Sequence, residues 1–92
     1  MDKNSAKETL RDIARHGCFS FTNHCRKRMR ERNVSADDIL NVLMWGKVSE
    51  IQESAEHNKW KCKVEGKDLD NDPLTLQAAV IKEKRTIVIT VY

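Results

Sequence analysis

Residues 59–66, KWKCKVEG, alternate strictly between polar and apolar side chains up to the glycine. Trp60, Cys62 and Val64 would lie on one side of an extended chain, with the lysines on the other. A period of two residues is typical of an antiparallel strand with one face in the core and one in water. The stretch therefore predicts a half-buried strand over about residues 59–65.

Three more segments of the second half have the composition of strands. They cover about residues 47–54, 74–82 and 86–91. Short polar segments separate the strands, with turns expected at 55–58 and 82–85 and a loop at 66–73. The last strand, TIVITVY, is rich in β-branched residues on both faces, so we expect it inside the sheet. Together these segments predict a four-stranded, mainly antiparallel sheet.

The first half of the chain has the helical period instead. The expected helices cover about residues 5–16, 22–32 and 36–45. Ser5 with Glu8, and Ser35 with Asp38, have the spacing of capping boxes at helix starts. Gly46 is expected to end the third helix at the position after its C-cap. Residues 18–21, CFSF, are expected to be a short connection.

Helices followed by strands with short links predict an α+β fold, in which two to three N-terminal helices cover one face of the sheet. A chain of 92 residues is expected to form a single domain, 1–92. So small a domain buries one compact core, and we therefore expect a functional site in a surface groove.

Positive charge is concentrated at the N-terminal end. Residues 1–34 hold nine Lys and Arg against four Asp and Glu, whereas residues 35–92 hold eight against ten. A local positive potential attracts phosphate whatever the net charge of the whole chain. The distribution favours a side of the molecule that faces a polyanion.

The remaining composition points to a protein of the cytoplasm. Cys18, Cys25 and Cys62 are too few and too irregularly spaced for a disulfide framework or a metal site. We expect reduced thiols, no bound metal and no cofactor. The charged start argues against a signal peptide, and no apolar run approaches the roughly 20 residues that cross a bilayer.

The expected second helix divides into three kinds of position. Phe21, Cys25 and Met29 line a face toward the core. Side chains on the opposite face point into water: Arg26, Lys27 and Arg30. Three residues spaced one turn apart form a ridge along the border of the apolar face: His24, Arg28 and Arg32. Arg32 is expected to lie nearest to the apolar face. Two interpretations of the ridge stay open. Its arginines could pair with carboxylates of the same chain, or they could bind a phosphate beside a histidine that exchanges protons.

The chain from Phe19 onward resembles a family of small bacterial domains of unknown function. The shared features are a helix of the form H-x-x-x-R-M-x-x-R, a glycine after the next helix and an end like V-x-T-V-Y. The matching residues here are His24, Arg28, Met29, Arg32, Gly46, Val88, Thr90, Val91 and Tyr92. That family is similar in its helix-then-sheet plan to the RelE and BrnT group of toxin ribonucleases. The resemblance implies RNA as substrate and an antitoxin protein as partner.

Our leading hypothesis is therefore a metal-independent endoribonuclease of a toxin–antitoxin module. His24 would act as base or acid, and Arg28, supported by Arg32, would clamp the phosphate. Tyr92 or Lys61 would be the second proton donor. Further contacts with the nucleic acid are assigned to four cations: Arg26, Lys27, Arg30 and Lys61.

Two other hypotheses are kept beside it. One is a non-enzymatic adaptor that binds nucleic acid or protein through the same basic helix. The other is a regulatory protein whose exposed sheet edge pairs with a partner chain.

Overall fold

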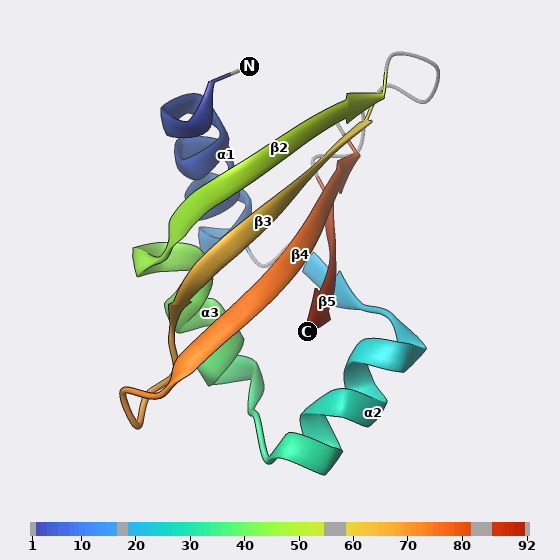
Figure 1. Cartoon of the computed structure of the whole chain (residues 1–92). Helices are drawn as coiled ribbons and strands as arrows, with labels where there is room; N and C mark the ends of the chain where they lie inside the picture. The colour runs from blue at the N-terminus through green and yellow to red at the C-terminus, as the bar shows by residue number, and fades with distance from the viewer. Residues whose placement is uncertain (1, 17–18, 55–58, 82–85, 92) are drawn as a thin grey trace.

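The computed structural model describes residues 2–16, 19–54, 59–81 and 86–91 (Figure 1). The helices are α1 (Lys3–Arg15), α2 (Asn23–Arg32) and α3 (Ala36–Trp45). The strands are β1 (Phe19–Phe21), β2 (Lys47–Ser54), β3 (Lys59–Lys67), β4 (Pro73–Ile81) and β5 (Thr86–Val91). The fold belongs to the predicted α+β class. The turns predicted at 55–58 and 82–85 lie outside the described residues.

The strands form one mixed sheet in the order β1-β5-β4-β3-β2. The pairs β2–β3, β3–β4 and β4–β5 are antiparallel, and β5 lies inside the sheet as predicted. The prediction of four strands is wrong, because residues 19–21 form a fifth strand that pairs parallel with β5. Three residues are too few to show a period, and the partner of β1 lies at the other end of the chain. From the local pattern, these residues could be interpreted only as a link between two helices.

Helices α1 and α3 cover one face of the sheet, while α2 lies apart from them and contacts β5 and β1 (Figure 1). Trp60, Cys62 and Val64 are buried on the helix side, as their alternation predicts. Helix side chains meet them in one core: Ala6, Leu10, Ile13, Ala14, Cys25, Ile39, Val42 and Leu43. The residues between them on β3 therefore face away from α1 and α3, on a side of the sheet that no described helix covers.

The first helix begins earlier than its expected capping box. Its N-cap is Asp2, whose Oδ1 accepts a hydrogen bond of 2.7 Å from the backbone N–H of Ser5. The expected box of Ser5 with Glu8 is therefore wrong, since an acidic cap three residues upstream takes the exposed amide. None of the described helices is long and apolar enough to cross a membrane.

The third helix has the capping box that the sequence predicts. The Ser35 hydroxyl accepts from the backbone N–H of Asp38 at 3.1 Å, and the Asp38 carboxylate accepts from the Ser35 N–H at 2.8 Å. The other oxygen of Asp38 accepts from the N–H of Leu69 at 2.9 Å. One side chain thus fixes both the start of α3 and the loop between β3 and β4.

Gly46 is the C-cap of α3, whereas the sequence placed it one position later, after the C-cap. Its φ is −74° and its ψ is 176°, which is ordinary extended backbone. A Cβ atom at this position would lie 2.5 Å from the Val42 carbonyl oxygen and 3.0 Å from that of Glu65. Glycine is required because a Cβ atom would overlap the Val42 carbonyl in the last turn of α3 and would also crowd the Glu65 carbonyl of β3. The sequence therefore located the helix end correctly for the wrong reason.

Candidate nucleic-acid interface

Helix α2 is fixed to the end of the sheet by its first turn. The Thr22 hydroxyl caps the helix by accepting from the Cys25 N–H at 2.9 Å, while the Thr22 N–H donates to the Ile89 carbonyl of β5 at 3.3 Å. The Cys25 side chain is fully buried in the core. Burial raises the pKa of its thiol, and a hydrogen bond with the backbone of Val91 opposes part of that rise. Cys25 is therefore a neutral anchor rather than a nucleophile.

The helix turns by about 100° per residue, so Cys25 defines which way each neighbour points. Lys27 and Glu31 lie opposite Cys25 and are exposed. One flank of α2 holds the predicted ridge of His24, Arg28 and Arg32. The other flank holds Arg26, Met29, Arg30 and Asn33. The cations of α2 are thus distributed on three sides of the helix.

The ridge differs in detail from its prediction. Arg28, in the middle, is half-buried, whereas His24 and Arg32 are exposed. The expectation that Arg32 lies nearest to the apolar surface is therefore wrong, because the helix ends at Arg32 and its last turn projects beyond the sheet. Arg32 takes part in an interaction within the chain.

The other cations of α2 have no partner within the described part of the chain. No hydrogen bond or ion pair joins the side chains of Arg26, Lys27, Arg28 or Arg30 to another described residue. The only acidic residue of the helix is Glu31. Of the two interpretations of the ridge, pairing of Arg28 with a carboxylate of the same chain finds no support among these residues. The four side chains leave a concentrated positive charge open to an outside anion.

A shallow groove lies on the flank away from the ridge. It is lined by Phe21, Arg26, Met29, Arg30, Asn33 and Val34. Three of these are apolar and half-buried, and two are exposed arginines. Phe21 and Met29 were predicted to face the core, and the pattern did not single out Asn33 or Val34. The spacing 26, 29, 30 and 33 is that of one helix face, so the polar and apolar mixture along it was the available signal.

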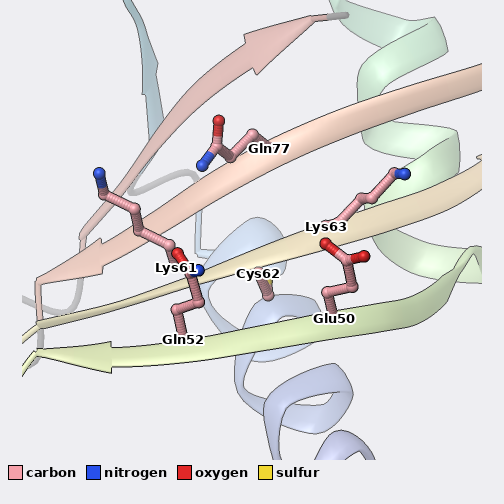
Figure 2. A pocket seen from close by; sticks show the side chains of 6 residues that line it. All are labelled: Glu50, Gln52, Lys61, Cys62, Lys63 and Gln77. Atoms are coloured by element: carbon pink, nitrogen blue, oxygen red, sulfur yellow. The ribbon is translucent and has the colours of Figure 1, made fainter.

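Lys61 lies elsewhere. It projects from β3 on the face of the sheet away from α1 and α3, beside Gln52 of β2 and Ala79 of β4. Figure 2 shows it in a polar depression with neighbouring side chains from three strands: Glu50, Gln52, Lys63 and Gln77. None of the residues that line this depression belongs to α2. The structure therefore does not bring Lys61 together with His24 and Arg28.

Tyr92 and the cysteines are the remaining residues for which a role was considered. Tyr92 and Cys18 lie outside the described residues. Cys25 and Cys62 are free, buried thiols. Across the described ranges, no group of three His, Cys, Asp or Glu side chains could hold a metal ion.

The fold and the helix define a small α+β domain with a basic helix at the parallel edge of a mixed sheet. Comparison with protein families identifies it further: the chain belongs to the family described as Domain of unknown function (DUF4258), whose model matches residues 21–92. The match includes all of α2 and the sheet from the last residue of β1 onward, and it leaves α1 outside. No curated protein matches the chain.

Proposed function

We propose that helix α2 binds the phosphates of single-stranded RNA. The observation that carries this proposal is the set of four cations on one ten-residue helix, none of them paired with another described residue: Arg26, Lys27, Arg28 and Arg30. Guanidinium groups match phosphate oxygens in a two-pronged geometry, and neutralised phosphates release counterions.

The placement of the cations favours a flexible strand over a duplex. Arg28 lies on one flank of α2, Arg26 and Arg30 lie on the other, and Lys27 lies between them on the exposed side. The narrow major groove of an A-form RNA duplex does not admit a helix about 10–12 Å wide, so such a duplex cannot reach both flanks of α2, whereas a single strand can bend around it. RNA rather than DNA is chosen because of the resemblance to toxin ribonucleases.

Fluorescence polarisation with a short labelled single-stranded RNA tests the proposal. Arg28→Ala removes a half-buried cation of α2 and should weaken binding several-fold, about 1 kcal/mol. Lys47→Ala is the matched control, because Lys47 is an exposed cation on β2, far from α2. Equal effects of the two substitutions, or no binding of RNA at low salt, would contradict the proposal.

Cleavage of the bound strand is a second candidate function, favoured by one observation. His24 and Arg28 lie one turn apart on the same flank of α2, and both lack a partner among the described residues. His24 would take the proton of a ribose 2′-hydroxyl as its oxygen attacks the adjacent phosphorus, and Arg28 would stabilise the crowded phosphorane. The 5′-oxygen would leave and take a proton from water. The products would be a 2′,3′-cyclic phosphate and a 5′-hydroxyl.

This candidate would make the chain the toxin of a toxin–antitoxin module. Incubation of end-labelled RNA with the protein in EDTA should then give fragments with wild type and none with His24→Ala, while both bind RNA equally. Intact RNA after hours with wild type, at concentrations that saturate binding, would leave a non-enzymatic adaptor as the function. Growth inhibition on induced expression should follow the same pattern across the variants.

A further inference from the structure

The two edges of the sheet are built differently. Edge strand β2 is interrupted by an irregularity between Val48 and Glu50 and carries the charged residues Lys47, Glu50 and Glu53. Bulges and charges of this kind discourage another chain from pairing with a sheet edge. Edge strand β1 is Phe-Ser-Phe, has no charged side chain and pairs with β5 alone among the described strands. Among the described strands, β1 is thus the edge without a bulge or a charge, and its protection is its length of three residues.

The backbone of β1 has groups available for pairing. The N–H of Thr22 points toward β5, since it donates to the carbonyl of Ile89 at 3.3 Å. Backbone groups of successive residues in a strand point to opposite sides. The N–H and C=O of Phe21 therefore point away from β5, toward the open edge of the sheet. An extended segment placed there could form main-chain hydrogen bonds.

The groove beside this edge supplies a pocket for side chains of such a segment. Phe21 belongs to both the edge and the groove, and with Met29 and Val34 it makes an apolar, half-buried floor. Arg26 and Arg30 form the rim. A strand added to β1 would direct every second side chain toward the helix side of the sheet, where this floor lies.

The chemistry of the lining selects the occupant. None of the six lining residues is acidic, and neither rim arginine has a partner among the described residues. A partner must therefore bring negative charge to the rim and an apolar side chain to the floor. A nucleobase fits less well, because the Phe21 ring is already in edge contact with Phe19, with centroids 5.8 Å apart and planes inclined at 64°. A nucleic acid also offers no main chain to pair with the strand.

We propose that the β1 edge and its groove bind an extended acidic segment of a partner protein. The segment adds as a sixth strand beside β1, places an apolar side chain against Phe21, Met29 and Val34, and pairs its carboxylates with Arg26 and Arg30. This site is separate from the ridge of His24, Arg28 and Arg32. It shares Arg26 and Arg30 with the proposed RNA-binding surface, so RNA and the segment compete for this flank of α2.

A panel of three fluorescein-labelled peptides, each about ten residues long, tests the proposal against the full chain. The first alternates Glu and Val, the second replaces Glu by Lys, and the third replaces Val by Ser. The first should bind, and the other two should bind at least about tenfold more weakly. Absence of binding by the first peptide, or binding by all three alike, would overturn the proposal.

Matched charge reversals then locate the site. Arg30→Glu should weaken binding of the Glu-Val peptide by about tenfold or more, whereas Lys27→Glu should change it by less than about twofold. Both residues are exposed on α2 and undergo the same change of charge, but only Arg30 lines the groove. Equal losses of affinity in the two variants would mean that binding depends only on the overall charge of the helix, which contradicts a groove site.

Amide hydrogen exchange distinguishes strand addition from loose contact. Bound peptide should slow exchange of the Phe21 N–H without changing the amides of β2. Protection at β2 instead, or self-association of the chain through β1 in sedimentation experiments, would each overturn the assignment to an acidic protein segment.

Discussion

Replacing Gly46 by alanine would place a Cβ atom 2.5 Å from the carbonyl oxygen of Val42, 3.0 Å from that of Glu65 and 3.1 Å from Cγ1 of Val64. Two of these atoms belong to the backbone of α3 and β3, so no side-chain rotation relieves the overlap. Overpacking of this kind costs about 1–3 kcal/mol. Alanine recovers about 0.4–1 kcal/mol by restricting the unfolded chain. A contact of 2.5 Å puts the cost at the upper end of that range, so the net loss of unfolding free energy should be about 2 kcal/mol, equivalent to about 8–16 °C in Tm for a domain of this size.

Thermal and urea unfolding followed by circular dichroism measure this loss. Gly66→Ala is the matched control, because it makes the same chemical change on the facing strand. A Cβ there would meet the Gly46 Cα at 3.1 Å and the movable Cγ1 of Val42 at 3.2 Å. Its loss should be about 1 kcal/mol or less. If Gly46→Ala were as stable as wild type, or no worse than Gly66→Ala, overlap of a Cβ atom with the carbonyls of Val42 and Glu65 would be refuted as the reason for glycine at residue 46.

Two further predictions concern pH. Hydrogen bonds from the backbone N–H groups of Ser35 and Leu69 lower the pKa of the Asp38 carboxyl. The contribution of this carboxylate to stability is therefore full above the unfolded pKa, about 4, and is lost as the pH falls through the lower pKa of the native state. Asp38→Asn should therefore flatten the acid side of a plot of urea midpoint against pH, and an unchanged acid side would contradict this role. Burial raises the pKa of the Cys62 thiol from 9.0 to about 12. Between these two pH values the thiol keeps its proton in the native state and loses it in the unfolded state. Stability should therefore fall as the pH rises from about 9 toward 12, and it should fall more in wild type than in Cys62→Ala. At pH 8, Cys62 of the native protein should react with iodoacetamide far more slowly than Cys62 of the unfolded chain. Equal labelling rates would count against the burial of Cys62.

The parts of the fold that sequence predicted are those that local physics determines. Alternation placed Trp60, Cys62 and Val64 in the core because a strand packed on one side requires a period of two. The spacing of Ser35 and Asp38 marked the start of α3 because both hydrogen bonds form within one turn. Strand β1 was missed because its three residues become a strand only by pairing with β5, a contact that no local pattern encodes.

The candidate site divides in the same way. Helical geometry correctly separated His24 and Arg28 from Arg26 and Arg30, because that depends only on the turn per residue. It could not show which flank of α2 faces the sheet edge, since that is set by the burial of Cys25 beside Val91. The groove on the Arg26 and Arg30 flank therefore emerged only from the structure. Lys61 could not be separated from the helix by sequence because the position of α2 relative to β3 is a tertiary property.

Arg26, Lys27, Arg28 and Arg30 of α2 are proposed to bind RNA phosphates, and the salt dependence of binding measures these contacts. For a single strand, the slope of log K against log salt is about −0.7 for each phosphate neutralised. Contacts from Arg26, Lys27, Arg28 and Arg30 should give wild type a slope of about −2.8, and the triple variant Lys27→Ala, Arg28→Ala, Arg30→Ala a slope of about −0.7. The control Lys47→Ala should keep the wild-type slope. A triple variant with the same slope as wild type would contradict the claim, because the phosphates would then be bound by some other part of the chain.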